Sequence, residues 1–433
     1  MAAQAALARR QLGSWLAPGA LFSIGWAGLV IGTLVAAPDY RIWPGVLWFL
    51  LMTSTAHLGG LLAQGVLRHI GALRPARPAL AAEFRYRMPL IVLSSVLGML
   101  GLVVLVASQG KGPLALFSPT QIAKLAPAFT GARYTDPDYE EPAAFLLLSV
   151  LLYFAAYLSG TLWAETRSWR RRLVALLPLF VVTLETMVLG ASTAFMGLLI
   201  NWVAAYLAAR LCLGKVDFVV VSLRNLLGGL LALCLFTGFY LLVHLIRMDA
   251  FQFVDADRPP VSSRFLLAVA RNQYVGHVSA FSGWLANHWD AWETPGLGRY
   301  DFAGPVGWLG VRVTRSPEAI HVSADPDEPV TNVYGLFRPL ALDWTLPGSA
   351  LVLLLLTLLA SLAYAVVRGG RPRAIPLLVW YYQMAVYVTG PPFTQTVFDG
   401  GLVLFGLYCL FAVSGNATGA AVNGCGEAPH PPA

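Results

Sequence analysis

Charged residues are scarce in this chain of 433 residues: Asp, Glu, Lys and Arg make up only 12% of it, while 57% is hydrophobic. A soluble domain of this length carries about 25% charged residues, so the composition excludes an ordinary soluble fold. The sequence also has no His and Cys cluster at metal-ligand spacing and no clear internal repeat. No metal site of that kind is therefore expected.

Cysteines are few as well. Only four occur, and the topology derived below places none of them in an outside loop: Cys212, Cys234, Cys409 and Cys425. No structural disulfide is therefore expected. Single glycine-rich turns are present, such as the one from Gly296 to Gly298, but one such turn does not make a phosphate-binding loop. No nucleotide or other cofactor is expected.

Long apolar runs are what the chain has in abundance. The sequence predicts ten spans that could each cross about 30 Å of hydrocarbon as a helix, at residues 16–37, 43–67, 88–108, 144–165, 173–190, 192–211, 218–246, 347–367, 375–391 and 398–414. The predicted fold class is therefore an all-α polytopic membrane protein with about ten transmembrane helices. These helices form a single integral membrane domain over residues 1–433.

Lys and Arg residues orient the predicted bundle, because cytoplasmic loops carry an excess of them. They gather in alternate loops, at residues 9–10, 68–87, 167–172, 210–224 and 368–373. Both termini are therefore predicted to be cytoplasmic and the long segment 248–343 to lie outside, while residues 415–433 form a disordered cytoplasmic tail. The net charge of +7 is spread over separate short loops, so nothing indicates a nucleic-acid partner.

A second outside segment, residues 108–142, is shorter and also polar. It contains Asp136 and Asp138, whose spacing could hold a divalent ion beside a phosphate. The simpler interpretation, a solvated turn flanked by prolines, is favoured.

The segment 248–343 is the candidate active loop, because charged residues, aromatics, Gly and Pro outweigh aliphatic sequence in it. After Pro259 and Pro260, Ser262 and Ser263 can cap a helix that runs toward Trp289. An apolar stripe along this helix predicts an amphipathic helix at the membrane surface.

Arg264 and Arg271 stand seven residues apart on this helix and therefore share one face. Guanidinium groups bind a lipid-borne phosphate or pyrophosphate through paired hydrogen bonds and keep their charge when desolvated. Snorkelling to ordinary lipid phosphates is the alternative. His277 lies on the same helix, where it could act as an acid or base or serve only as a hydrogen-bonding residue.

Glu185 interrupts an otherwise apolar span, from Leu176 to Leu189. An ionisable group at that depth is costly, so it normally faces a partner or a wet cavity. A catalytic role and a structural contact between helices are both open for Glu185.

Polar residues crowd the end of the long loop. Arg299, Tyr300 and Asp301 are held between glycines, and from Val330 the chain reads TNVYGLFRPLALDWTLPG before a long apolar run. Polar side chains in this second stretch lead directly into a membrane helix. They are expected to lie at the outer mouth of the bundle, and they include Asn332, Tyr334, Arg338 and Asp343.

These motifs resemble those of the bacterial oligosaccharide repeat-unit polymerases, the Wzy-type enzymes of O-antigen and exopolysaccharide assembly. Members of that family often carry a Gly-x-Tyr-x-Phe-like segment, then Thr-Asn-Val-Tyr, a downstream Arg, and Asp-Phe-Gly-x-x-Gly entering a transmembrane helix. The matching residues here are Gly298 to Phe302, Thr331 to Tyr334, Arg338, Asp343 and Gly348. Trp344-Thr345 replaces the family's Phe-Gly, and Gly190 to Thr193 stands where many members have Gly-Ser-Arg.

The resemblance implies an inner-membrane glycosyltransferase of the GT-C type that needs no metal. It would transfer a growing glycan from undecaprenyl pyrophosphate to the non-reducing end of a new lipid-linked repeat unit on the periplasmic side, with a chain-length regulator protein as a partner. The candidates for pyrophosphate and substrate binding are Arg264, Arg271, Arg299, Arg338, Tyr300, Asn332 and Tyr334. The candidates for the base are Asp343, Asp301, Glu185 and His277.

Other functions share this layout. A ligase that moves the same lipid-linked polymer onto a lipid A core or a protein would have a similar number of helices and a similar loop. A transporter or flippase of lipid-linked sugars would be expected to show inverted repeats and charges near the midplane. A structural membrane scaffold is the remaining alternative.

Overall fold

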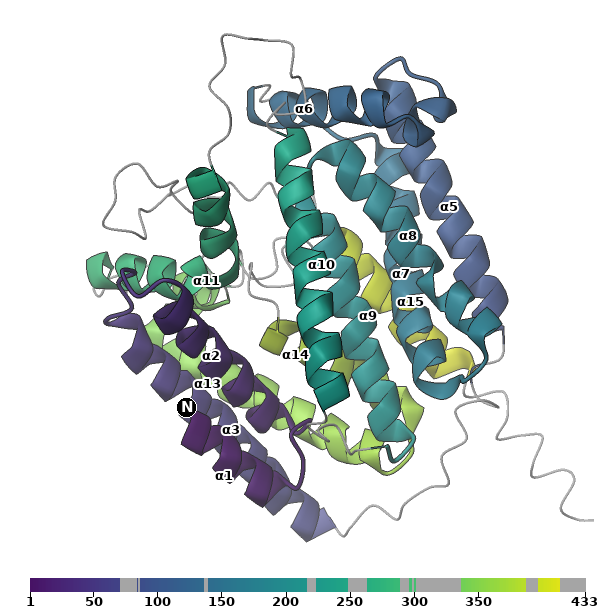
Figure 1. The fold of residues 1–433 in the computed structure, drawn as a ribbon. Coiled ribbons are helices and arrows are strands. Elements are labelled where there is room, and N and C mark those ends of the chain that lie inside the picture. The colour runs from purple at the N-terminus through teal and green to yellow at the C-terminus, as the bar shows by residue number, and fades with distance from the viewer. Residues whose placement is uncertain are drawn as a thin grey trace, which may run out of the picture.

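The computed structural model describes residues 1–70, 84, 86–135, 139–215, 223–247, 263–288, 296–297, 300, 336–386 and 396–412 (Figure 1). Across these residues every regular element is a helix, and none of them lies in a strand. Seven of the helices are long and apolar enough to cross a membrane. The chain is therefore a polytopic helical membrane protein.

The seven long helices coincide with the first six predicted spans and the eighth. They are α2 Pro18–Ala36, α3 Gly45–Ile70, α5 Arg87–Ser108, α7 Ala143–Glu165, α8 Trp169–Leu189, α9 Ser192–Cys212 and α13 Phe337–Arg368. The break between α8 and α9 falls at Gly190, whose φ of 59° lies in the left-handed region that glycine adopts without strain.

The other three predicted spans also contain helices, while residues 218–222, 387–391 and 413–414 of these spans lie outside the described residues. These helices are α10 Leu223–Arg247, α14 Ile375–Val386 and α15 Thr396–Ala412. The described part of α14 has 12 residues, which corresponds to about 18 Å along a helix, and residues 387–391 of the predicted span are outside the described residues. A tenfold crossing of the membrane therefore stays a prediction.

Four helical elements were not predicted from the sequence: α1 Ala2–Leu12, the 3₁₀ helices Pro113–Phe117 and Pro372–Ala374, and α6 Pro119–Thr135. Figure 1 shows α6 lying across the ends of the long helices, where it packs against α8 and α10. The described part of residues 108–142, the second segment predicted to lie outside, is therefore largely helical. Asp136 and Asp138 lie outside the described residues.

The helices form two groups. On one side of Figure 1, α3 packs against α2 and α13, and α11 Ser263–Asn287 packs against all three. On the other side, α7 packs against α5, α8, α9 and α15. α14 contacts α2 and α13 of the first group and α9 and α15 of the second, so it joins the two.

Five buried aromatic rings hold the first group together. The Phe337 ring centroid of α13 lies 4.4 Å from that of Trp26, 5.3 Å from that of Phe49 and 5.7 Å from that of Phe281, while Phe22 packs on both Trp26 and Phe337. Aromatic pairs at such distances stabilise a core beyond the area they bury. This aromatic cluster fixes where α11 meets the beginning of α13.

The outer faces of the long helices are apolar. On α5, Leu93, Val96 and Leu100 recur at helical spacing and are each about half exposed, whereas Ile91 and Leu102 on the opposite face are fully buried. A water-soluble protein rarely exposes contiguous apolar surface of this kind. The exposed faces are therefore the surface that meets lipid.

Close contacts between helices depend on glycine. A Cβ atom built on Gly160 of α7 would lie 2.2 Å from the backbone oxygen of Trp202 on α9, and one on Gly59 of α3 would lie 2.8 Å from the backbone oxygen of Leu354 on α13. Small residues allow membrane helices to approach backbone to backbone. Two of the tightest helix pairs are therefore specified by single glycines.

Candidate functional site

The break in α13 is the feature on which the candidate site is built. Thr345 has φ 63° and ψ 172°, so the chain forms a short helical piece that ends at Trp344 and a long one that continues to Arg368. This backbone conformation is almost confined to glycine and costs a side-chain-bearing residue about 1–3 kcal/mol. The Thr345 hydroxyl accepts a hydrogen bond from the Gly348 N–H at 3.4 Å, as an N-cap residue does.

Asp343 lies in the last turn of the short piece and is completely buried. Its two carboxylate oxygens accept hydrogen bonds from the backbone N–H of Tyr300, at 3.0 Å to Oδ1 and 2.9 Å to Oδ2. Hydrogen bonds to an ionised group are roughly twice as strong as neutral ones. Asp343 therefore anchors a residue of the long loop to the start of the membrane helix.

The same loop also caps the short helical piece. The backbone N–H groups of Gly296 and Leu297 donate to the carbonyl oxygens of Leu342 and Asp343, each at 2.9 Å. These carbonyls lie at a helix C-terminus, where no intrahelical donor is available. A Cβ atom on Gly296 would lie 2.4 Å from Asp343 Oδ1, so only glycine fits against the carboxylate.

Arg338 and His277 are placed around the aromatic cluster. Arg338 follows Phe337 in α13 and is 8% exposed, while His277 lies one turn before Phe281 in α11 and is 1% exposed. Since the Phe281 and Phe337 rings are in contact, the two polar residues belong to facing helices at the same end of the bundle. The structure therefore groups two of the predicted site residues near Asp343.

The helix predicted in the loop exists as α11, but its second half does not lie on the surface of the molecule. Nearly all side chains from Val275 to Leu285 are buried, on every face of the helix. Thr33 of α2 donates to the Val275 carbonyl at 3.1 Å, and the Gly45 N–H of α3 donates to Ser282 Oγ at 3.0 Å. This half therefore lacks the exposed face that an amphipathic helix has, because α2, α3 and α13 surround it, and its location at the membrane surface stays a prediction.

Arg271, in the first half of α11, already has a carboxylate partner. Its guanidinium forms an ion pair with Asp39 and stacks 4.8 Å from the Tyr40 ring centroid, and the Tyr40 hydroxyl donates to Asn272 Oδ1 at 2.5 Å. Asp39 and Tyr40 follow α2 in the chain, so these contacts tie α11 to the connection between α2 and α3. The geometry favours a fastening role for Arg271, and its predicted role in pyrophosphate binding stays a prediction.

Glu185 is not part of this group. It is 5% exposed on α8, which packs with α5, α6, α7 and α9 on the side of Figure 1 away from α11 and α13. The four candidate bases therefore do not form one cluster. Four other predicted residues lie outside the described part of the chain: Arg299, Asp301, Asn332 and Tyr334. Arg264 belongs to α11, but its side chain is not among those described.

Asp399 is a buried acid that the sequence analysis did not single out. It is 7% exposed on α15, close enough to the hydroxyl of Tyr157 for an electrostatic interaction, and that hydroxyl accepts a hydrogen bond from Gln383 Nε2 at 2.7 Å. A lone carboxyl group in an apolar helix is the same signal that identified Glu185. A search for single carboxyl groups in apolar helices would therefore have identified Asp399 as well as Glu185.

The fold and this site define a polytopic helical membrane protein in which a long loop is fastened to the start of a membrane helix. Comparisons with protein-family models, with curated proteins and with solved structures gave no match to this chain. Among the described residues, no group of three His, Cys, Asp or Glu side chains could hold a metal ion.

Proposed function

We propose that the protein is a polysaccharide polymerase of the GT-C type, which extends a lipid-linked glycan by one repeat unit at each transfer. One observation carries this proposal. The sequence resembles the repeat-unit polymerases through two motifs that are far apart in the chain, and in the structure a residue of the first, Tyr300, is hydrogen bonded to Asp343, the first residue of the second. Motifs of a common site are expected to meet in this way.

The backbone at Thr345 supports the same proposal. The resemblance places a glycine two residues after the Asp, and in this chain that position adopts a conformation that glycine favours although threonine occupies it. A local geometry that the present residue does not favour is often retained at functional sites. Here it ends the short helical piece directly after Asp343.

In the proposed reaction, a hydroxyl group at the non-reducing end of a new repeat unit attacks the anomeric carbon of the growing glycan. The bond from that carbon to the pyrophosphate oxygen breaks, undecaprenyl pyrophosphate leaves, and the hydroxyl proton passes to a base. Positive charge stabilises the leaving group, and Arg338 and Arg299 are the proposed cations. A chain-length regulator protein remains a proposed partner.

Asp343 is proposed to act mainly by positioning. Its carboxylate is buried and accepts hydrogen bonds from Tyr300, so it holds the chain segment that carries Arg299 and Asp301 on either side of that residue. Asp301 is then the proposed base, while Glu185 and His277 remain candidates. The proposed orientation puts this end of the bundle in the periplasm and both termini in the cytoplasm, in a bacterial inner membrane.

The test is to incubate the purified protein in detergent with undecaprenyl pyrophosphate-linked repeat units and to separate the products by size. A ladder spaced by one repeat unit is expected, and the variant Asp301→Asn should give none at an unchanged protein level. The surface variant Glu140→Gln is the matched control and should give the normal ladder. Transfer of polymer only onto an added acceptor lipid would instead identify a ligase, and no product in either assay would overturn an enzymatic function.

A further inference from the structure

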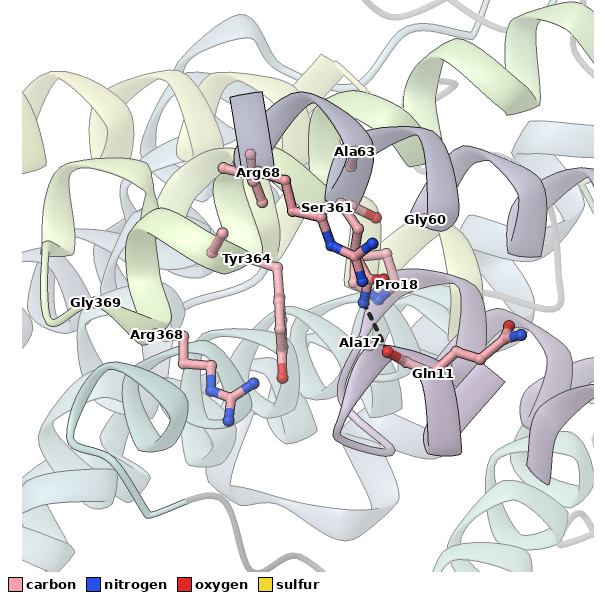
Figure 2. A pocket seen from close by; sticks show the side chains of 13 residues that line it. Gln11, Ala17, Pro18, Gly60, Ala63, Arg68, Ser361, Tyr364, Arg368 and Gly369 are labelled. Atoms are coloured by element: carbon pink, nitrogen blue, oxygen red, sulfur yellow. Dashed lines mark hydrogen bonds between the residues drawn. The ribbon is translucent and has the colours of Figure 1, made fainter. Parts of the chain in front are cut away.

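A cavity lies at the other end of α13 (Figure 2). It is bounded by the end of α1, the beginning of α2, the last turns of α3 and the last turns of α13, and its volume is about 770 Å³. Arg368 at this end is 25 residues from Asp343, which corresponds to about 37 Å along a helix. The cavity is therefore separate from the candidate site described above, and its size is typical of a pocket for a small molecule.

Two arginines give this cavity its charge. Arg68 from α3 and Arg368 from α13 line it, and the lining includes no Asp or Glu. Among the residues that the structure describes, neither guanidinium forms an ion pair. The Nη1 atom of Arg368 lies 3.4 Å from the position a Cβ on Gly13 would take, so it rests against the glycine that ends α1. The cavity thus presents two positive charges that no described carboxylate balances.

Buried hydroxyl groups on α13 accompany the arginines. Ser361 is 7% exposed and lines the cavity, and its Oγ atom has no hydrogen-bond partner among the described residues. Leaving such a group unpaired costs about 1–3 kcal/mol, so it is expected to meet a ligand or water. Tyr364, one turn further along, is also buried, and its hydroxyl lies beside Arg368 and Ser14.

The wall between these polar groups is held in place from α3 and α1. Gln64 Nε2 donates to the Gln11 carbonyl oxygen at 2.8 Å, the contact drawn in Figure 2, and Gln11 Oε1 lies 2.6 Å from His57 Nε2. The rest of the lining is apolar and includes Pro18 and Leu67. The cavity therefore combines two arginines, a buried serine and an apolar wall, next to hydrogen bonds that join α1 to α3.

We propose that this cavity binds a phosphate group, held by the guanidinium groups of Arg68 and Arg368 with a hydrogen bond from Ser361. Arginine matches phosphate because its planar group donates hydrogen bonds in pairs. The phosphate can come from the head group of an anionic phospholipid, whose acyl chains would follow the apolar wall, or from a soluble phosphate ester. The site does not depend on the proposed polymerase activity.

The experiment measures binding to the purified full-length protein by native mass spectrometry and by thermal unfolding. The probes are short-chain phosphatidylglycerol, glycerol 3-phosphate, and a short-chain diacylglycerol that lacks phosphate. Phosphatidylglycerol is expected to bind and to raise the unfolding temperature, whereas diacylglycerol should do neither. Equal binding of glycerol 3-phosphate and phosphatidylglycerol would identify a soluble ester as the source, and preference for the lipid would identify the head group.

Variants show whether the cavity is responsible. The double variant Arg68→Gln/Arg368→Gln should weaken phosphate binding by about tenfold or more, because two charge-assisted contacts are lost. Arg170→Gln/Arg171→Gln removes the same charge from exposed positions on α8 and should leave binding unchanged. If the first double variant does not fold, Ser361→Ala should still lower the affinity several-fold. Binding that survives the changes in the cavity, or that falls equally in the control, would overturn the proposal.

Discussion

Both carboxylate oxygens of Asp343 accept a hydrogen bond from the backbone N–H of Tyr300, which lies 43 residues earlier in the chain. This contact joins the long loop to the last turn of the short helical piece of α13, directly before the break at Thr345. It supports a positioning role for Asp343. A positioning residue and a base affect the pH dependence of the reaction differently, so the two roles can be distinguished.

Replacing Asp343 with Asn tests that role. An amide offers one acceptor oxygen where the carboxylate has two and removes the charge from the hydrogen bonds, so we expect a loss of about 1–3 kcal/mol in the free energy of unfolding. The rate of ladder formation should fall strongly, while its dependence on pH keeps the same shape. Disappearance of the acidic limb of the pH–rate profile would instead show that Asp343 is the base.

Gly296 is predicted to be essential for the same contact. In Gly296→Ala, the new Cβ would lie 2.4 Å from Asp343 Oδ1, so the loop or the carboxylate must move, and product formation should fall. Gly28→Ala is the matched control, because nothing lies within 4 Å of a Cβ at that position in α2. Ladder formation by Gly296→Ala and Gly28→Ala is compared at equal protein levels in the membrane. Equal activities would contradict the close contact between Gly296 and the Asp343 carboxylate.

Thr345 is predicted to store strain. Thr345→Gly should raise the unfolding midpoint, because relief of about 1–3 kcal/mol of backbone strain exceeds the few tenths lost with the capping hydroxyl. Thr345→Ala keeps a Cβ in the unfavourable conformation and loses the cap, so it should lower the midpoint. Thermal unfolding in one detergent compares the three proteins, and a less stable glycine variant would mean that the break in α13 is not strained.

Arg271 and Asp39 are predicted to act as a pair. Because both side chains are partly exposed, their coupling free energy should be small, about 0.2–1 kcal/mol in a double-mutant cycle of Arg271→Gln and Asp39→Asn. If Arg271 only fastens α11, the two single variants should affect ladder formation equally. Loss of activity in Arg271→Gln alone would show that this arginine also binds substrate.

Arg87 and Glu165 form a more deeply buried ion pair, between the beginning of α5 and the end of α7. Glu165→Ala should cost about 3–5 kcal/mol, because it leaves the guanidinium buried with no carboxylate partner. The double variant Arg87→Met/Glu165→Leu should be more stable than Glu165→Ala, since neither charge is then buried. Unfolding by denaturant measures the stability of both variants. A double variant less stable than Glu165→Ala would mean that water reaches Arg87 when Glu165 is absent.

The sequence predicted the helices well where apolar length alone determines them. The spans at α2, α3, α5, α7, α8 and α9 and the long part of α13 were each predicted within a few residues, because a run of about 20 apolar residues has one stable form in hydrocarbon. Shorter or more polar helices, such as α1 and α6, were missed. Their stability comes from packing on neighbouring helices, which local composition does not reveal.

The candidate site was predicted in part. Asp343, Arg338 and His277 were singled out because polar residues in or next to apolar helices are costly and therefore noticeable, and their roles stay predictions. The contacts of Arg271 were not predicted, since Asp39 and Tyr40 look like ordinary turn residues until α11 is placed beside them. Glu185 was singled out for the same reason, yet it lies in the other group of helices. A charged residue in an apolar run is unusual wherever it lies, so the sequence does not show which helices surround it.

The sequence by itself determined that this is a helical membrane protein, since its apolar runs can satisfy their backbone hydrogen bonds in lipid only as helices. Only the tertiary structure decided that Asp343 meets Tyr300, that Arg271 meets Asp39, and that Arg68 and Arg368 line one cavity. These contacts join residues tens or hundreds of positions apart. They depend on how the helices pack, which is set by single glycines and by the aromatic cluster rather than by the hydropathy of any one segment.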